Sequence, residues 1–260
     1  MESALTYNGK IFSASIIEEI KKHALEVYPD ECCGVIVNDL YYPLENIAEN
    51  PKKDFKFPKT GWPLAGKFQA IIHSHPNGTV EPSIKDMEEM LRTPNQVWGI
   101  CTTDGETVSD VVFYGDLIPD VPLMNRQFRS GPSGTDGKGD CYALIRDYYW
   151  LELGIRLKEF PRTDDWYTNK ESPGNMYVEG FEQTGFKRIS ESELLPGDVI
   201  LLEINTIKSG CPNHAGIFLG WKEGVLHHFR APYLSKKDPM SRYHKYMTYF
   251  LRHESHNASV

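Results

Sequence analysis

The sequence predicts two domains, an α/β domain followed by an α+β domain. Helix and strand patterns alternate from the N-terminus to about residue 115. Residues 116–139 are rich in Gly, Pro and Asp and lack sustained apolar periodicity, so we interpret them as an interdomain linker. In residues 140–260 one helix pattern precedes a series of strand patterns, which indicates an α+β domain.

The first domain, residues 1–115, begins with an amphipathic helix predicted over 13–28, which Ser15 and Glu18 could start as a capping box. A second helix is predicted over 83–92, after a stretch of turn residues. The predicted strands of this domain are 32–38, 40–48, 68–75, 96–103 and 107–114.

The second domain, residues 140–260, begins with a helix predicted over 141–154, which carries Leu144, Ile145 and Leu151 on one side. A long polar stretch with prolines follows and carries no predicted element. The predicted strands are 198–204, 214–220, 224–229 and 245–253. We therefore expect a helix followed by an antiparallel sheet.

The composition excludes several classes of function. The net charge is −8 and the densest basic run, residues 51–59, is short, so nucleic-acid binding is not indicated. No run of about 18 apolar residues occurs, so no membrane-spanning segment is expected. The N-terminus lacks the apolar stretch of a signal peptide, and five cysteines without regular spacing do not suggest a disulfide framework. We expect a protein made and folded in a reducing cytoplasm.

Residues 73–86, HSHPNGTVEPSIKD, combine metal-ligating side chains at regular spacing. His73 and His75 are two residues apart in a predicted strand, so both imidazoles point to one face. Asp86 lies in the first turn of the helix that begins near Ser83, and a strand and helix joined by a turn can converge. Two histidines and a carboxylate are a usual ligand set for catalytic zinc, with the fourth position open to water. The pattern predicts a Zn²⁺ site.

Each part of this pattern also has a simpler interpretation. Ser83 and Asp86 have the spacing of a capping box, which is common at helix starts. Two histidines in a strand can be half-exposed polar residues. The presence of all these residues within one strand–turn–helix unit favours the metal site.

A zinc hydrolase also needs a base for the bound water, and Glu31 in PDECCG is the candidate. PDECCG and HSHPNGTVEPSIKD together resemble the JAMM (Mov34/MPN-type) metalloproteases, over about residues 5–115. This resemblance implies a cytidine-deaminase-like fold with His73, His75 and Asp86 as zinc ligands. It also implies Glu31 as the general acid/base, and a serine of the motif as donor to the developing oxyanion. That serine is Ser83.

In GKGDCYALIRDYYW, a glycine-rich segment places Cys141 at the start of a predicted helix. The partial positive charge at a helix N-terminus lowers the pKa of a thiol, and the thiolate is the nucleophilic form. A buried helix cysteine is the common alternative. It fits poorly because Cys141 occupies the first helical position beside the charged Asp140, so we interpret Cys141 as a nucleophile.

A cysteine nucleophile needs a base, and His214 at the start of a predicted strand is the candidate. His227 lies in the next predicted strand, and adjacent hairpin strands could bring the two rings together, so that His227 orients His214. His228 points to the opposite face of its strand. It would take this role if the strand register differed by one residue.

The order of the cysteine helix, LLPGDVILL, HAGIFLG and a histidine-bearing strand resembles the NlpC/P60 cysteine peptidases, over about residues 125–253. The resemblance implies a papain-like fold for this domain. The family usually carries Asp-Cys-Ser/Thr-Gly at its nucleophile. This chain has Asp-Cys-Tyr-Ala, so the residue after the cysteine is not small.

A JAMM domain followed by an NlpC/P60 domain resembles the tail assembly peptidases of lambda-like siphophages. This resemblance implies other phage tail-tip proteins as partners. It implies murein stem peptides as substrate of the second domain, cut between D-glutamate and a diamino acid, and a protein or isopeptide bond as substrate of the first. The protein would occupy the host cytoplasm during assembly and then the virion tail tip, and it would act in the host periplasm on infection.

Two other functions fit parts of the sequence. One is a non-phage JAMM protease of the deubiquitinase type, with the second domain auxiliary. The other is a structural tail-tip component whose sites have decayed. The completeness of both residue sets favours a hydrolase with two sites, a zinc metallopeptidase and a cysteine endopeptidase.

Overall fold

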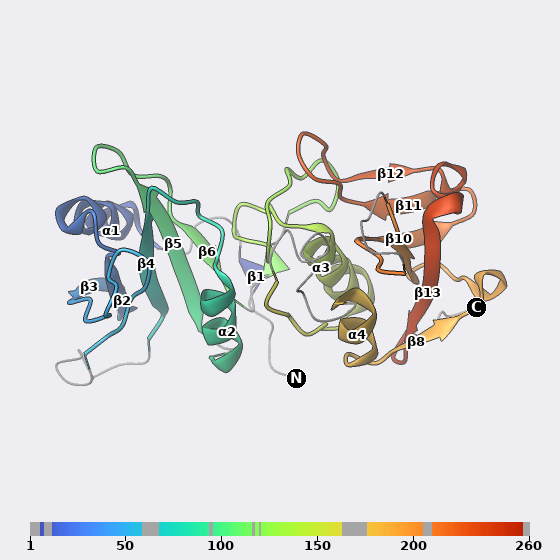
Figure 1. Cartoon of the computed structure of the whole chain (residues 1–260), viewed down its shortest axis with the longest axis horizontal. Coiled ribbons are helices and arrows are strands. Elements are labelled where there is room, and N and C mark those ends of the chain that lie inside the picture. The colour runs from blue at the N-terminus through green and yellow to red at the C-terminus, as the bar shows by residue number, and fades with distance from the viewer. Residues whose placement is uncertain are drawn as a thin grey trace. The chain divides into compact units, whose positions relative to one another are not determined.

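The computed structural model folds into two compact units, shown in Figure 1. The first unit comprises residues 1–120 and 134–136, and the second unit comprises residues 121–133 and 137–260. The structure describes residues 6–7, 12–58, 68–93, 96–115, 118–119, 121–162, 176–204 and 210–256.

A five-stranded sheet with the order β3–β2–β4–β5–β6 forms the frame of the first unit. β4 and β5 run parallel, and the other neighbouring strands of this sheet run antiparallel. The bounds are β2 Cys33–Val37, β3 Leu40–Leu44, β4 Ala70–Pro76, β5 Val97–Thr103 and β6 Val112–Tyr114. A separate parallel pair joins β1, Thr6–Tyr7, to β7, Ile118–Pro119.

The alternation of side chains along these strands buries both faces of the sheet. Ile36 and Ile72 pack in one cluster with Ile20 of α1, Ala14–Val27. Val35 and Ile71, their neighbours in sequence, pack in a second cluster that also contacts Met90 of α2, Ile84–Arg92. Almost every residue of the central strands β2 and β4 is therefore buried, as expected for strands that are covered on both faces.

A six-stranded sheet with the order β12–β11–β10–β9–β13–β8 forms the second unit. All its neighbouring strands are antiparallel, as the sequence predicts. The bounds are β8 Phe186–Ile189, β9 Val199–Leu202, β10 His214–Gly220, β11 Gly224–His227, β12 Lys236–Asp238 and β13 Met247–His253.

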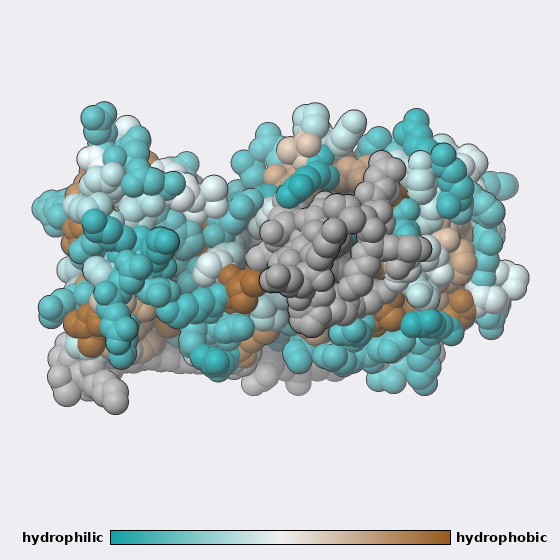
Figure 2. Space-filling model, viewed as in Figure 1, coloured by the Kyte–Doolittle hydropathy of each residue, from teal (hydrophilic) through white to brown (hydrophobic). Residues whose placement is uncertain are grey.

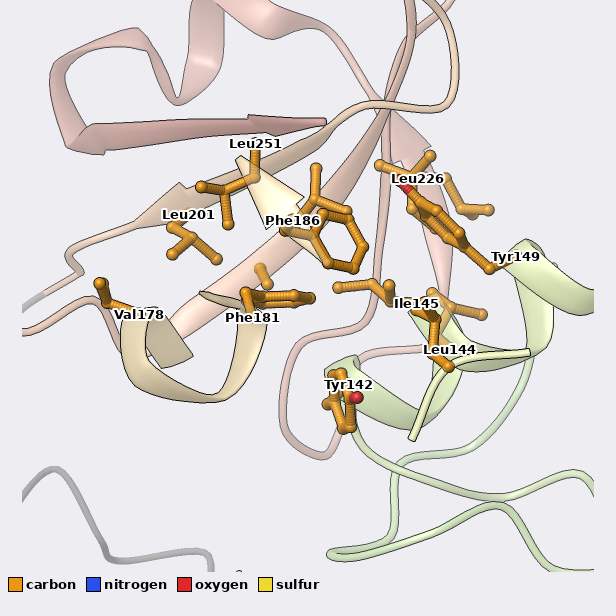
Figure 3. Packing of buried hydrophobic residues seen from close by; sticks show 14 residues of the cluster. Tyr142, Leu144, Ile145, Tyr149, Val178, Phe181, Phe186, Leu201, Leu226 and Leu251 are labelled. Carbon is orange, nitrogen blue, oxygen red and sulfur yellow. The ribbon is translucent and has the colours of Figure 1, made fainter. Parts of the chain in front are cut away.

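Two helices, α3 (Cys141–Leu153) and α4 (Met176–Glu182), pack against this sheet. Figure 3 shows side chains of both helices pointing toward side chains of β8, β9, β11 and β13. Tyr149 and Phe181 are almost completely buried in this cluster. Burial of apolar surface here, at about 25 cal/mol per Å², fixes the two helices that carry residues of the second site.

Most of the predicted linker is instead an anchored part of the second unit. Arg126 forms a buried ion pair with Asp147 of α3, and Ser133 Oγ donates to the same carboxylate at 2.8 Å. The Arg126 amide also donates to Ser235 Oγ at 2.8 Å. The Gly- and Pro-rich composition predicts irregular backbone correctly. It does not reveal the anchors, because the partners lie elsewhere in the sequence.

Three short elements, α4, β8 and β12, are not predicted by the sequence patterns. They have 7, 4 and 3 residues, which is too short for an apolar period to stand out. Helix α1 also begins one residue after Ser13, whose Oγ accepts from the Ile16 amide, and not at Ser15. The strand predicted over 107–114 is reduced to β6.

The face of the molecule in Figure 2 is mainly hydrophilic, with hydrophobic side chains in small separate areas. Trp221 and Tyr233 are the most exposed of the large apolar side chains that the structure describes. Among the described helices, none has the length and apolar character to cross a membrane.

The Arg126–Asp147 pair predicts how strongly the 121–133 segment is held. Replacing Arg126 with Met should destabilise the second unit by about 3–5 kcal/mol, because it leaves a carboxylate buried without its partner. Urea unfolding of the full chain measures the loss of stability, and hydrogen exchange of the α3 amides assigns it to the second unit. Lys21→Met, which breaks the exposed pair with Asp110, should cost under about 1 kcal/mol in the first unit. Equal small losses for both variants would contradict the assigned anchor.

Candidate functional sites

The C-terminal end of β4 carries the two histidines of the first site. His73 is fully buried between β2 and β5, opposite Cys33 and Ile100. Its ring stacks on Phe55, with 4.6 Å between ring centroids. The chain then turns through Asn77, which has a positive φ of 54°, and returns as α2.

Three potential metal ligands from β4 and α2 converge at this turn. The two Nε2 atoms of His73 and His75 lie 3.0 Å apart. Oδ1 of Asp86 lies 3.3 Å from Nε2 of His73, and Oδ2 of Asp86 lies 3.4 Å from Nε2 of His75. Ligand atoms held about 2.1 Å from a tetrahedral ion are about 3.4 Å apart. The separations therefore fit a small metal ion at the centre of this group.

The hydrogen bonds around the ligands also suit a metal. His75 Nδ1 lies 2.7 Å from the Thr79 carbonyl oxygen, so it donates there and leaves Nε2 with a lone pair. Burial alone would raise the pKa of Asp86, but the two histidines and Ser83 hold it well below its usual range. The carboxylate is therefore ionised and can act as an anionic ligand.

Ser83 makes the capping box that was the simpler interpretation of its spacing. Its Oγ accepts from the Asp86 amide at 3.1 Å and donates to Asp86 Oδ2 at 2.7 Å. The capping box and the metal group are not alternatives, because Asp86 belongs to both. In this arrangement the hydroxyl proton of Ser83 points to Asp86.

Glu31 lies two residues before the start of β2 and is buried, with 6% of its surface exposed. Its amide donates to the Pro51 carbonyl at 2.7 Å, and its carbonyl accepts from Asn46 at 3.0 Å, so its backbone is fixed. Burial raises the pKa of its carboxyl to about 7, with His75 opposing and Asp86 adding to the shift. A group with this pKa can exchange a proton near neutral pH.

Cys141 is the first residue of α3, as predicted, and Asp140 caps the helix by accepting from the Ala143 amide at 2.8 Å. Arg162 compensates the Asp140 charge, with Nε 2.5 Å and Nη2 3.0 Å from its carboxylate oxygens. Glu159 pairs with the same guanidinium. The nucleophile candidate therefore sits at the edge of a buried charge network.

The expectation of a low thiol pKa is wrong for this state of the protein. Burial and the neighbouring Asp140 raise the pKa of Cys141 to about 11, against lowering contributions from Tyr177 and the Ala215 backbone. Tyr177 of α4 places its hydroxyl 2.7 Å from Sγ. The helix N-terminus is present as predicted, but the sequence did not show that the surrounding side chains desolvate the half-buried thiol.

A hydrogen-bonded row of side chains runs across β10, β11 and β12. His214 Nε2 lies 3.2 Å from His227 Nδ1, and His227 Nε2 lies 3.2 Å from Asp238 Oδ2. Asp238 was not predicted. Burial opposes its ionisation, but hydrogen bonds from Tyr243 and Lys236 hold its pKa well below the usual range. The ionised carboxylate can only accept a hydrogen bond, so His227 Nε2 carries the proton and donates, which fixes the tautomers of both rings.

His214 and His227 are both neutral. Burial holds the pKa of His214 well below its usual value and lowers that of His227 to about 4. Because His227 carries its proton on Nε2, its Nδ1 accepts from Nε2 of His214. The Nδ1 of His214 is left with a lone pair. The structure thus brings together His214 and His227, not His214 and His228.

His228 lies on the wall of the same cavity as Cys141 and His214. It is 1% exposed, and its Nε2 has no hydrogen-bond partner within the described part of the chain. Burial lowers its pKa to about 4. The cavity measures about 170 Å³, and aromatic rings of Phe128, Phe160, Phe181 and Phe229 form much of its lining. Such a lining suits an organic ligand with a few polar groups.

Comparison with known proteins matches a different family to each of the two parts of the chain. The family of prokaryotic homologs of the JAB domain matches residues 13–113, and the NlpC/P60 family matches residues 125–252. Tail tip assembly protein K of Escherichia phage N15 is 30% identical over 236 residues, which cover 87% of this chain and 89% of the relative. The chain belongs to the family of phage tail tip assembly protein K.

Tail tip assembly protein K of Escherichia phage lambda is 32% identical over 198 residues, covering 76% of this chain and 87% of the relative. The predicted resemblance to lambda-like tail proteins with a JAMM-type and an NlpC/P60 domain is therefore confirmed. Among solved structures, NlpC1 from Trichomonas vaginalis is similar, with 21% identity, a TM-score of 0.36, and coverage of 50% of this chain and 39% of that chain.

Proposed function

We propose that this member of the protein K family is a tail-tip peptidase with two hydrolytic sites. The first is a zinc-dependent (iso)peptidase site in the first unit. The second is a Cys–His endopeptidase site that cleaves murein stem peptides at the D-glutamate–diamino acid bond. The observation that carries the proposal is the row from Asp238 through His227 to His214, which ends in a cavity shared with Cys141.

The tautomers assign a role to each residue of the second site. His214 Nδ1 takes the proton of the Cys141 thiol and later returns a proton to the leaving amine. His227 accepts from His214 Nε2 and so holds the ring in this orientation. Asp238 balances the charge that His214 gains, through the His227 ring. These three residues convert a neutral thiol into a nucleophile when substrate is bound.

In the first site, His73, His75 and Asp86 would hold Zn²⁺, and its fourth position would take water. Bound zinc lowers the pKa of that water and polarises the scissile carbonyl. Glu31 acts as general base toward the water and then as general acid toward the leaving nitrogen, as its pKa of about 7 allows. Ser83 serves as the oxyanion donor, which requires its hydroxyl to turn from Asp86.

The substrates and location follow from the family. The second site would act on murein in the host periplasm, and the first on a protein or isopeptide bond during tail maturation in the host cytoplasm. Other tail-tip proteins are the proposed partners, and the virion tail tip is the proposed final location. The mixed sheet of the first unit supports a cytidine-deaminase-like fold. The helix that carries Cys141 on an antiparallel sheet supports a papain-like fold.

One observation favours a second candidate function, a structural tail-tip component with an inactive cysteine site. Desolvation raises the pKa of the half-buried Cys141 to about 11 and its sulfur contacts Tyr177, so the described state holds little thiolate. A resting state of this kind also suits an enzyme that acts only on infection. Digestion of murein decides between the two functions.

We expect the purified protein to release stem-peptide fragments from murein, and Cys141→Ala to abolish that release because Cys141 is the only cysteine among the described residues that line the cavity. His214→Ala should lower activity at least about 100-fold, since it removes the base. Products separated by chromatography and identified by mass spectrometry measure this. Cys211→Ala, another buried cysteine of the same unit, should keep most of the activity. Undiminished digestion by Cys141→Ala would exclude the proposed nucleophile.

We expect on the order of one zinc ion per chain, as three protein ligands and a water imply. His75→Ala and Asp86→Ala should lose most of the zinc, because each removes a ligand. Glu31→Gln should keep zinc and lose hydrolysis by the first site. Elemental analysis of the dialysed protein measures the content, with His23→Ala as a histidine control from α1 of the same unit. Loss of zinc from Glu31→Gln as large as from Asp86→Ala would refute the role given to Glu31.

A further inference from the structure

The Cys141 sulfur has a hydroxyl neighbour that the proposed row of histidines does not use. The Tyr177 Oη atom lies 2.7 Å from Sγ, and both residues line the same cavity. Tyr177 comes from α4, an element that no sequence pattern indicates. At this distance the hydroxyl can either fill space beside the thiol or form a hydrogen bond that takes part in its chemistry.

Packing in the core holds the Tyr177 ring in place. Phe181 lies one helical turn later, and the two rings stack with centroids 5.8 Å apart and an interplanar angle of 15°. Phe181 is 2% exposed and packs edge-on against Tyr142 and Phe186. Packed side chains therefore direct the hydroxyl at the sulfur. Because the ring is already held in place, forming the hydrogen bond costs little conformational entropy.

The surroundings of Cys141 make such a donor necessary. The negative charge of Asp140, at the helix start, disfavours the thiolate. Arg162 forms an ion pair with Asp140 and so weakens this effect. Glu159 partly offsets Arg162 in turn. On the β10 side stands His214, which is neutral until it accepts the proton. Until His214 is protonated, the groups that can donate directly to sulfur, among the residues that the structure describes, are the Tyr177 hydroxyl and the backbone of Ala215.

We propose that Tyr177 is a catalytic residue of the cysteine site, whose hydroxyl donates a hydrogen bond to the Cys141 thiolate. The proton leaves Sγ for Nδ1 of His214, the S–H bond breaks and an N–H bond forms, and Tyr177 keeps its own proton throughout. A thiolate has no proton to donate, so in this state the tyrosine must be the donor. Burial and the neighbouring sulfur hold the pKa of Tyr177 well above its usual value, so it stays protonated.

This inference deepens the proposed function and rests on it only for the role of Cys141 as nucleophile. A hydrogen bond to a charged group is typically worth about tenfold or more in an equilibrium constant. Loss of the hydroxyl should therefore lower the thiolate fraction by about that factor. Loss of a merely space-filling group would change access to the sulfur and leave its ionisation unaltered.

The test is the pH dependence of Cys141 alkylation in the full chain, for wild type and Tyr177→Phe. Iodoacetamide is the probe, and mass spectrometry of the peptide that contains Cys141 gives the rate. The rate at neutral pH reports ionisation, and the plateau at high pH reports access. We expect Tyr177→Phe to raise the midpoint by about one pH unit and to lower the neutral rate about tenfold relative to the plateau.

Tyr149→Phe is the matched control. It removes another buried tyrosine hydroxyl of the same unit, one that donates to the Gly197 carbonyl at 2.7 Å and not to the sulfur. It should leave the Cys141 midpoint in place. In murein digestion, Tyr177→Phe should lower kcat about tenfold with KM nearly unchanged.

A midpoint for Tyr177→Phe that equals or lies below the wild-type value would overturn the proposal. A variant that changed only the plateau rate at high pH, and not the midpoint, would also overturn it, because the hydroxyl would then affect only access to the sulfur. The alkylation assay needs no substrate, so its result is separate from the proposed function. If murein is not digested but the midpoint shifts as expected, the substrate assignment fails and the role of Tyr177 at the thiolate stands.

Discussion

Both sites depend on ionisable side chains that are buried away from water. Such side chains must stabilise one another, because water cannot. His73 and His227 are fully buried, and Asp86 nearly so. A buried charge without a partner costs several kcal/mol, so each group must be paired or neutral. The first site satisfies this by setting Asp86 against two imidazoles. The second does so with two neutral rings that lead to Asp238, at the rim of the sheet.

The two scaffolds fulfil this requirement differently. In the first unit the parallel pair β4–β5 needs a crossover, and the crossover is the turn and α2 that bring Asp86 back to the histidines. In the second unit the groups come from adjacent antiparallel strands and from the start of α3. Gly216 lies opposite His227 in this sheet, and a Cβ there would come within 2.5 Å of Val225 Cγ1 and 3.1 Å of the His227 Cβ, so the close approach of β10 and β11 at this point needs glycine.

Local patterns predicted what depends on nearby residues. The metal group and the position of Cys141 follow from strand alternation and helix starts, and the structure places these residues as expected. His214 pairs with His227, which the sequence favoured while leaving His228 open, but His228 lines the same cavity as His214 and does not face away from it. Asp238 could not be predicted, because it reaches His227 from a strand of three residues with no apolar period. Tyr177 was missed for a similar reason. The high thiol pKa was missed because burial is a property of the whole fold.

Histidine ¹⁵N NMR of the full chain, titrated from pH 7.5 to 4.5, tests most directly whether burial sets the chemistry of the cysteine site. The tautomers derived above put the proton of His214 and of His227 on Nε2 at pH 7. Both rings should stay neutral down to about pH 5, since burial lowers the pKa of His227 to about 4 and that of His214 well below its usual value. Titration of either ring near pH 6.5, or a His227 proton on Nδ1, would contradict the account.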